Sequence, residues 1–521
     1  MMVIGPILFD VDAVIIGCHV MACKHCKMAM QVGRCPIIGT LETLIRDVVS
    51  KSAMKIADFN RGRKESDEFN PYLNGIHRPL PAEVTLSDLR VSGTIPAELD
   101  GRYIRIGPNP ITAPNPGTYH WFMGDGMVHG VRLKDGKALW YRNRWIRSRV
   151  VSDALGEQPA PGPHEPPFDI VNTNVLGHAG EIWALVEAGG CPVRIDDELN
   201  TIAYDPFADT LKGGSFSAHP HLDHRTGEMH AICYSAQSLT EIRHVVVDKA
   251  GKVRREESVA VQDGPSIHDC MITEKYVIIL DMPVTFSMTS LLGGHGFPYK
   301  WNPKHKARVG LLPREGKGTD TIWCDIEPCY AFHICNAFDN ADGTVTVDAC
   351  VHDSVFTKNS HGPDSAAMPF ERWQVDPNAR RVSRTVIDAD AQEFPRPNEM
   401  MIGQPYRYAY SLLVPKDDSG SFPEEAKLFK HDLTAGTRQV HDFGHGRVAG
   451  EFAFVPAANA SAEDEGWLMG YVINPADDTS ELVILNAQDF EDAPQAVIHI
   501  PHRIPPGFHG NWVQNQSSSV P

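Results

Sequence analysis

The stretch FHICNAFDNADGTVTVDAC, residues 332–350, joins two apolar runs through the turn Ala341-Asp342-Gly343. The second run, TVTVDAC, alternates apolar and polar side chains, which is typical of a half-buried β-strand. An Asp-Gly pair between two such runs favours a tight turn. The stretch therefore predicts two β-strands joined by a short turn.

The same pattern extends from residue 70 to the C-terminal region. Apolar runs separated by Gly- and Pro-containing turns include RYIRIG, EIWALVEA, KYVIILDM, YRYAYSLLV, GWLMGYVI and ELVILNA. Long helical periodicity is absent here, so this part of the chain is predicted to be all-β. About 450 residues of β-structure exceed one sandwich or small barrel, whereas a β-propeller reaches this length by repeating four-stranded blades. No WD or kelch signature gives the number of blades.

Composition excludes some classes of partner. The 521 residues are 42% apolar and 22% charged, with a formal charge of −18. This excess of acidic residues argues against a nucleic-acid partner, because phosphate binding needs clustered Lys and Arg. Eleven scattered cysteines, no secretory signal pattern and no long uncharged apolar run predict a cytoplasmic protein, and they leave a peripheral membrane contact open.

Residues 1–69 differ from the rest and are predicted to be an N-terminal extension, poorly ordered or a mis-assigned start, before the β-propeller domain at 70–521. They hold four of the eleven cysteines, including Cys23 and Cys26, and an amphipathic pattern from Leu41 to Val49. The spacing between the cysteine pairs is too short for a usual zinc finger, so a metal site here is disfavoured. Met54 is an alternative start.

Four of the 24 histidines lie in or beside apolar segments: His219, His268, His333 and His509. Taken singly, each is better explained as a hydrogen-bonded core histidine. A larger group sits in polar or turn-like surroundings and is expected to be surface or structural: His77, His164, His224, His230, His244, His305, His352, His361, His431, His441, His445 and His499.

The separations of the four histidines along the chain, 49, 65 and 176 residues, match one blade, one blade and several blades. Equivalent inner positions of a propeller converge on its axis, so the four imidazoles are expected to meet there. Imidazoles without acidic ligands suit Fe(II), Zn or Cu. Metal-bound imidazole usually donates its other N–H to a carboxylate, and Glu187, Glu393 and Glu451 are the candidates. Each of these glutamates could instead be a solvated strand end.

Nine stretches in order resemble the carotenoid cleavage oxygenases, the non-haem iron enzymes that split alkenes with O2. The matching stretches are GRYIRIGPNP, YHWFMGDGMVHG, NTNVLGHAGEIWALVEAG, AHPHLDHRTGE, IHDCMITEKYV, FHICNAFD, AQEFPRPNE, GEFAFVP and IPPGFHGNW. The resemblance covers residues 70 to 515 and leaves residues 1–69 unaccounted for.

The resemblance implies a seven-bladed β-propeller with a helical and loop cap over an axial iron site. It implies that His219, His268, His333 and His509 bind one Fe(II) per subunit, with Glu187, Glu393 and Glu451 orienting them. O2 would be the co-substrate and two carbonyl fragments the products. No catalytic acid or base is needed, in keeping with the absence of a nucleophile motif such as G-x-S-x-G.

The family divides between carotenoids or apocarotenoids and phenolic stilbenes. Stilbene cleavers resemble one another in pairing a Tyr with a Lys, whereas this chain has Trp145 at the expected Tyr and no Lys in 151–172. An apolar polyene is therefore the first choice of substrate, a stilbene or phenylpropanoid the alternative, and a non-catalytic binding scaffold a minor alternative.

A polyene would have to be drawn from a membrane or micelle, and one uncharged stretch is a candidate contact. In MPVTFSMTSLLGGHGFPY (282–299), five apolar side chains could form an exposed patch at a tunnel mouth, or could pack under the cap. These side chains are Phe286, Met288, Leu291, Leu292 and Phe297.

Overall fold

The structure, a computed structural model, describes residues 54–63, 69–164, 169–358, 361–365, 368–414 and 425–515. The chain separates into two units, Met1–Ile56 and Ala57–Pro521, of which the second holds nearly all of the described residues. The cysteine pair and the amphipathic segment lie outside the described residues. The division at residues 69 and 70 stays a prediction.

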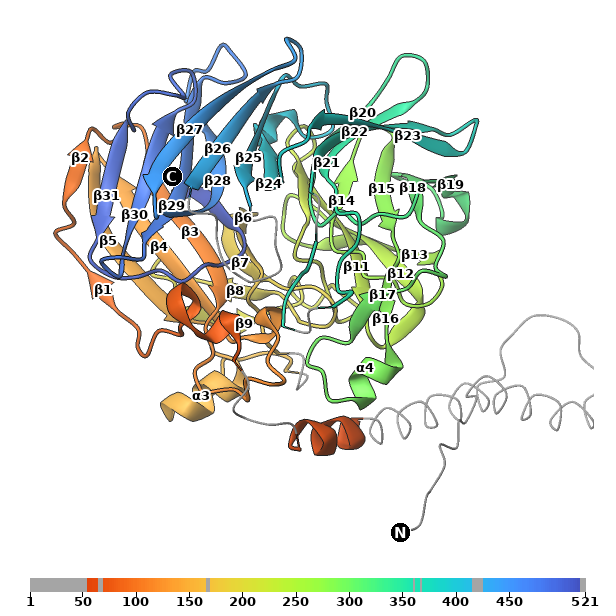
Figure 1. Cartoon of the computed structure of the whole chain (residues 1–521), viewed down its shortest axis with the longest axis horizontal. Helices are drawn as coiled ribbons and strands as arrows, with labels where there is room; N and C mark the ends of the chain where they lie inside the picture. Colours follow the sequence, from red (N-terminus) through yellow and green to blue (C-terminus); the bar gives the residue numbers. More distant parts are fainter. Residues whose placement is uncertain are drawn as a thin grey trace, which may run out of the picture. The chain divides into compact units, whose positions relative to one another are not determined.

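Seven blades surround a central axis in the part of the chain that the structure describes (Figure 1). From the axis outward, the first blade is β32 (Gly510–Gln514), β3 (Gly101–Pro108), β4 (Gly126–Lys134), β5 (Lys137–Trp145) and β1 (Thr85–Leu86). The second blade is β6 (Asn174–His178), β7 (Glu181–Leu185), β8 (Val193–Ile195) and β9 (Thr201–Tyr204). The third blade is β10 (His221–Asp223), β11 (Glu228–Ser235), β12 (Ser238–Val247) and β13 (Val253–Ala260). The fourth blade is β14 (Cys270–Ile272), β15 (Tyr276–Asp281), β18 (Arg308–Pro313) and β19 (Ile322–Asp325).

The fifth blade is β20 (Ile334–Asp339), β21 (Val345–Cys350), β22 (Phe370–Asp376) and β23 (Arg381–Asp388), and the sixth is β24 (Gln392–Pro397), β25 (Tyr408–Leu413), β26 (Glu425–Asp432) and β27 (Thr437–His445). The seventh is β28 (Val448–Pro456), β29 (Gly466–Asn474), β30 (Thr479–Asn486), β31 (Ala496–Ile500) and β2 (Val91–Gly93). Strands pair antiparallel within blades, and one parallel bridge, Asp325 with Arg381, joins the fourth blade to the fifth. The predicted all-β propeller is confirmed.

The stretch 332–350 forms the β20–β21 hairpin at the inner side of the fifth blade. Val345 pairs with Asp339, and the turn between them closes through the Asn340 N–H, which donates to the Thr344 carbonyl at 2.8 Å. Gly343 adopts φ +86°, a conformation that a side chain would strain. All six residues of β21 are buried, because neighbouring blades cover both faces.

Both ends of the described chain close the ring. β2 adds an outer strand to the seventh blade, and β32 adds the innermost strand to the first. The segment leading into β32 passes so close to β3 that a Cβ on Gly107 would lie 2.6 Å from the Cα of Gly507. Glycine is therefore required where the chain enters the axis just before His509.

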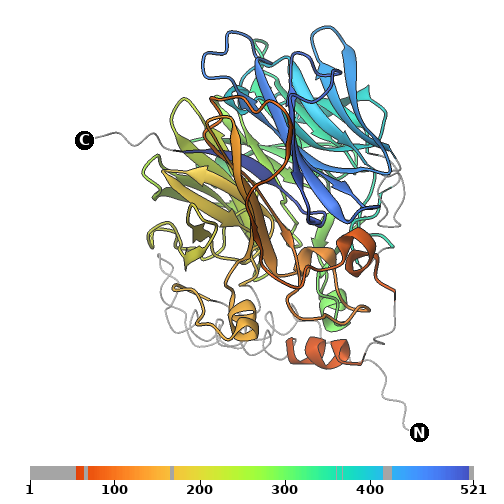
Figure 2. The same ribbon diagram turned by 90° about the vertical axis from the view of Figure 1, so that its left-hand side faces the viewer.

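Short helices and loops cap one end of the propeller (Figure 2). They are η1 (Pro71–Leu73), η2 (Gly75–His77), η3 (Trp121–Met123), α3 (Arg149–Leu155), and α4 (Met288–Leu292), which joins the ribbon of β16 (Val284–Phe286) and β17 (Tyr299–Trp301). Two other 3₁₀ turns are η4 (Gly318–Asp320) and η5 (Glu399–Met401). The cap that the resemblance implies is present.

A chain that begins at Met54 is expected to keep the wild-type melting temperature, whereas one that begins at residue 69 should melt about one degree lower. Residues 54–61 are helical, and within them Ala57 is fully buried. The Asn60 side chain donates to the Leu292 carbonyl of α4 at 2.7 Å. Losing such a buried contact costs about 1 kcal/mol. Thermal unfolding of both truncations tests this, and an unstable Met54 chain would contradict it.

Candidate metal centre

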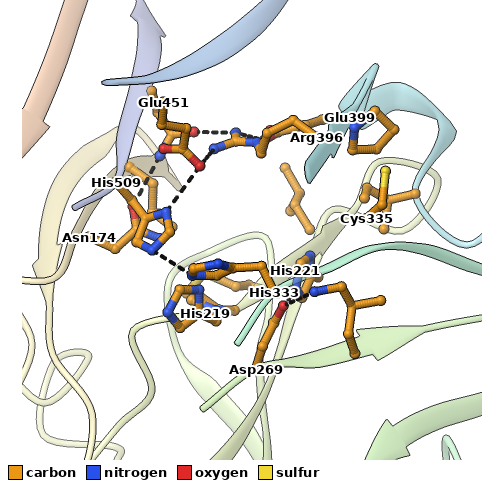
Figure 3. Close-up of a pocket in the computed structure, with 18 of the residues that line it drawn as sticks. Asn174, His219, His221, Asp269, His333, Cys335, Arg396, Glu399, Glu451 and His509 are labelled. Atoms are coloured by element: carbon orange, nitrogen blue, oxygen red, sulfur yellow. Dashed lines mark hydrogen bonds and ion pairs between the residues drawn. The ribbon is translucent and has the colours of Figure 1, made fainter. Parts of the chain in front are cut away.

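The four predicted histidines lie at the start of four inner strands. His219 and His268 precede β10 and β14 by two residues, and His333 and His509 immediately precede β20 and β32. The inner strands meet from blade to blade around the axis, which brings the four rings together although they are far apart in sequence. One ligand atom from each lies within 4.8 Å of the others. Figure 3 shows three of these rings facing one another.

Three of the imidazoles are each bonded to one of the predicted glutamates. The Nδ1 atoms of these rings lie 2.8 Å from Glu187 for His268, 2.5 Å from Glu393 for His333, and 3.0 Å from Glu451 for His509. An ionised carboxylate only accepts hydrogen bonds, so each Nδ1 carries the proton. The Nε2 atom of each neutral ring is left with a free lone pair.

The free lone pairs need a cation. His333 Nε2 and His509 Nε2 lie 3.2 Å apart, so when both rings are neutral two lone pairs face each other. His219 Nε2 is buried and has no hydrogen-bond partner among the described residues. An unpaired buried polar atom is costly, and a metal ion would bind all of these nitrogens. The four imidazoles thus fit a borderline divalent ion such as Fe(II), Zn or Cu.

The electrostatics of the centre keep Glu451 and Glu393 ionised and His219 neutral, whereas Glu393 outweighs burial and raises the pKa of His333. Burial would raise the pKa of Glu451, but His509, Arg396 and the Gly510 N–H outweigh it and lower that pKa to about 2. Burial likewise opposes ionisation of Glu393, yet His333 and His352 hold its pKa below the ordinary value. For His219, burial and then the neighbouring imidazoles lower the pKa well below the ordinary value. The carboxylates therefore supply negative charge while His219 stays a neutral donor.

His352 has a role at this centre that the sequence did not indicate. It was expected to be a surface or structural histidine, but it is 3% exposed and its Nε2 lies 2.7 Å from Glu393 Oε1. An isolated bridge between Tyr330 and His352 places the ring there. Glu393 thus connects two imidazoles, His333 through Oε2 and His352 through Oε1.

A chain of polar contacts that sequence reasoning also missed links the inner strands around the axis. Arg396 of β24 donates to Glu451 at 3.0 Å and to Asn511 at 2.7 Å (Figure 3). Asn511 of β32 donates to Asn174 of β6 at 3.1 Å, and Asn174 donates to the carbonyl of Ala218, the neighbour of His219, at 2.8 Å. These contacts position His509 and His219 relative to each other.

Asp269 makes similar polar contacts among the third, fourth and fifth blades. Its side chain lies 2.9 Å from His221 Nε2 of β10 and accepts from the Ile334 N–H of β20 at 2.8 Å. It therefore ties together the strands next to three of the four histidines. Sequence alone gives no sign of this, because one Asp beside a His resembles any polar turn.

Aromatic rings pack between the histidines and the cap. The Phe332 ring lies edge-on to His268 with centroids 5.2 Å apart. Phe122 contacts Phe332 and Phe508, and Phe297 and Phe356 extend the group. Such rings exclude water and contact an apolar ligand favourably.

Trp145, by contrast, does not belong to this site. It is 3% exposed, packs with Leu80, Met127 and Val151, and donates its indole N–H to the Asn109 carbonyl at 2.8 Å. Its identity therefore reports on local packing and carries no argument about the substrate.

Comparisons with known proteins find relatives over most of the chain. The family model described as retinal pigment epithelial membrane protein matches residues 77–514. A carotenoid cleavage oxygenase of Mycobacterium tuberculosis is 41% identical over 85% of this chain and 97% of its own length. The apocarotenoid-15,15'-oxygenase of Synechocystis is 30% identical over 81% of this chain and 92% of its own length.

Two solved structures have the same fold over most of the chain. Cobalt-substituted Synechocystis apocarotenoid oxygenase aligns with a TM-score of 0.74 and 27% identity, covering 85% of this chain and 98% of its own. Pseudomonas brassicacearum lignostilbene dioxygenase aligns with a TM-score of 0.77 and 27% identity, covering 86% and 99%. The chain belongs to the carotenoid cleavage oxygenase family of alkene-cleaving oxidoreductases.

Proposed function

We propose that this enzyme is an Fe(II)-dependent dioxygenase that cleaves a carbon–carbon double bond of a carotenoid or apocarotenoid. The observation that carries the proposal is the convergence of four imidazoles, among which His219 has a buried Nε2 atom with no hydrogen-bond partner in the described part of the chain. One O2 is consumed, both the C=C and the O=O bonds break, and each alkene carbon takes one oxygen, so two carbonyl products account for every atom.

The residues divide the work between holding the metal and shielding it. His219, His268, His333 and His509 would hold one Fe(II) per subunit, which supplies the activation of O2. Glu187, Glu393 and Glu451 fix the ring orientations. The rings above the centre hold the alkene and exclude water. No side chain has to move a proton, because the reaction releases and consumes none.

An apolar polyene is the substrate class that the site supports best. Between the histidines and the cap lie Phe122, Phe332, Phe356 and Phe508, whose rings suit a conjugated hydrocarbon. Relatives at 30% identity or more carry names of carotenoid or apocarotenoid cleavage. The fit to lignostilbene dioxygenase keeps a stilbene as the second candidate. A binding scaffold is disfavoured, because a protein without metal chemistry would have no need of all four histidines and all three glutamates.

Metal analysis followed by product analysis tests the proposal. The purified protein should contain one iron per subunit and convert an apocarotenal into two carbonyl fragments in an O2-dependent reaction, with little turnover of resveratrol. Preferential cleavage of resveratrol would establish that the substrate is a stilbene. Protein that binds no iron and cleaves neither compound would leave only the scaffold.

The enzyme is proposed to be cytoplasmic and to take its substrate from a membrane surface through the cap. No helix in the described part of the chain is long and apolar enough to cross a bilayer. Of the five side chains in 282–299, Met288 is 46% exposed, whereas Phe286 and Phe297 pack on the core. Two segments that contact this stretch also carry exposed apolar side chains, Phe59 at 64% and Met123 at 37%. A patch of Phe59, Met123 and Met288 is therefore the candidate contact.

Replacing Phe59 and Met288 together with serine is expected to weaken liposome binding at least about a hundredfold, since each buried apolar side chain contributes about 1.5–3 kcal/mol. The apparent KM for a long polyene should rise while iron content stays unchanged. Val386→Ser, at a residue 52% exposed in the fifth blade, is the matched control and should change neither. Unaltered liposome sedimentation and polyene kinetics in the double variant would exclude this patch.

A further inference from the structure

A cavity with both polar and apolar lining lies beside the four-histidine centre, between the inner strands. It is lined by residues of β6, β10, β20, β24, β28 and β32, and it reaches the rings of His219, His333 and His509. Its volume of about 120 Å³ is enough for a few water molecules. His268 does not line it, because Phe332 covers that ring.

The lining of this axial cavity is rich in side chains that bind divalent cations. Besides the centre itself, it contains the imidazoles of His178, His221 and His224 and the carboxylates of Asp269 and Glu399. His224 is exposed and Leu222 is half-buried, so the cavity reaches the surface beside β10. The proposed reaction uses none of these five polar residues as an iron ligand.

The cap side of the centre offers a cation a much poorer path. There Phe332 packs on His268 and His333, and Phe122 packs on Phe332, so a partly dehydrated divalent ion would pass rings that replace none of its water. Moving an ion through apolar surroundings without compensating ligands is strongly unfavourable. The alkene and the ion therefore require approaches of opposite chemistry.

We propose that the axial cavity is the route by which the divalent metal ion enters and leaves the centre, separately from the alkene. This inference rests on the proposed iron-dependent function. Imidazole nitrogen and carboxylate oxygen atoms along the cavity replace the hydration waters of the ion in turn. Arg396 also lines the cavity, but its charge is paired with Glu399 and Glu451.

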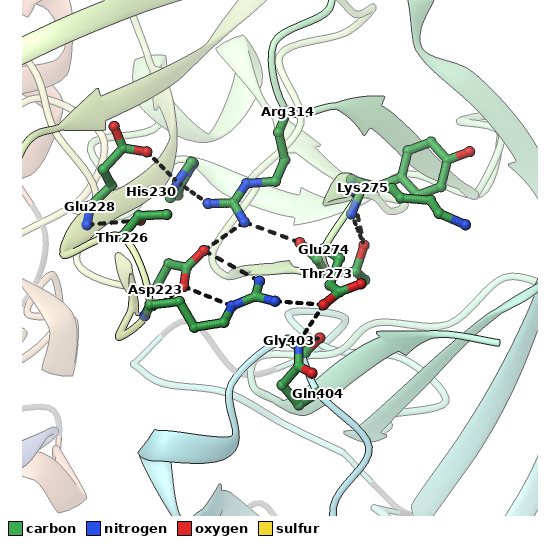
Figure 4. Close-up of polar contacts among 12 residues, drawn as sticks. Asp223, Thr226, Glu228, His230, Thr273, Glu274, Lys275, Arg314, Gly403 and Gln404 are labelled. Carbon is green, nitrogen blue, oxygen red and sulfur yellow. Dashed lines mark hydrogen bonds and ion pairs between the residues drawn. The ribbon is translucent and has the colours of Figure 1, made fainter. Parts of the chain in front are cut away.

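The strand at the mouth is firmly anchored, so a side chain there can be enlarged without moving it. Asp223 of β10 is 1% exposed and accepts from Arg314 at 2.7 Å and from Arg225 at 3.3 Å (Figure 4). Arg225 also donates to Glu274 at 2.6 Å, which joins the third blade to the fourth. Leu222, next to this anchor, lines the cavity and bonds to no ligand.

Leu222→Trp is the decisive variant, with Leu222→Ala as its matched control. Narrowing the route by which the ion passes slows its binding and its release by the same factor, so the ratio of the two rate constants, the Kd, stays unchanged. Release is measured on the iron-loaded protein by transfer of Fe(II) to an excess of a coloured chelator, and uptake by adding Fe(II) to the stripped protein. In Leu222→Trp, both rates should fall at least about tenfold at constant Kd. In Leu222→Ala, neither should fall.

Several results would overturn the route. Unchanged iron-exchange rates in a folded Leu222→Trp protein would show that the ion does not pass through the cavity. If the KM for O2 rose while the exchange rates stayed unchanged, the cavity would be a path for O2 instead. A changed Kd would assign the effect to the ligands. Should the tryptophan variant fail to fold, Leu222→Phe decides by the same measurements. Wild-type protein that holds no iron would refute the proposed function, whereas iron-loaded protein with unaltered exchange would refute the route alone.

Discussion

Replacing His268 or His333 with alanine is expected to abolish alkene cleavage and to lower bound iron to below about one tenth of the wild-type content, because metal binding depends on the full ligand set. Each substitution removes one of four converging Nε2 donors. It also leaves a buried carboxylate, Glu187 or Glu393, without the imidazole that it accepts from. Iron per subunit and product formation from an apocarotenal are the measurements.

A buried histidine elsewhere provides the control. His441 of β27 is 6% exposed and bonds through Nδ1 to the Phe490 carbonyl at 3.0 Å, so its removal disturbs a core hydrogen bond without touching the axis. His441→Ala should lower the melting temperature while the remaining folded protein keeps its iron. If the His268 and His333 variants both retain full iron and full activity, the centre has been assigned to the wrong residues.

The fold class could be predicted from the sequence because each strand is a local signal. In 332–350 the alternation, the Asp-Gly turn and the strand lengths all belong to neighbouring residues, and β20 and β21 form as predicted. The blade count could not be derived in this way. β2 and β32 complete blades whose other strands are far away in sequence, and the ribbon of β16 and β17 interrupts the fourth blade.

The histidine cluster could be predicted for a different reason. His219, His268, His333 and His509 stand beside apolar runs, and the propeller converts equivalent positions into proximity. The same pattern could not distinguish four ligands from four core histidines without the resemblance to a known family. Only the structure supplies the unpaired Nε2 atom of His219 and the 3.2 Å approach of His333 to His509.

The supporting residues that were missed share one property. His352, Asp269 and Arg396 act through partners 41 to 65 residues away, in a neighbouring blade or at its edge. Each has an ordinary polar sequence context, so no local pattern marks it. Trp145 illustrates the reverse error, since its sequence position suggested a substrate contact and the fold places it in a separate core cluster.

The three carboxylates at the centre are unequal, and Glu393 is the most informative to replace. Its Oε2 accepts from His333 at 2.5 Å and from the Phe394 N–H at 2.7 Å, while Oε1 lies 2.7 Å from His352. A glutamine whose amide oxygen occupies the Oε2 position keeps the first two bonds. Its NH₂ group then faces His352, which can accept by moving its proton to Nδ1, an atom with no partner among the described residues. The fold should therefore persist.

What Glu393→Gln loses is the negative charge that strengthens His333 as a donor. Iron retention or activity is expected to fall by roughly 10–100-fold, the usual effect of losing a ligand's carboxylate partner. The control is Glu371→Gln, because Glu371 is equally buried but bonds Trp373 and Arg384 in the fifth blade. This control should lower the melting temperature and leave iron release unchanged. A Glu393→Gln protein that matches the wild type in both iron retention and turnover would mean that the charge on this carboxylate contributes nothing to the metal centre.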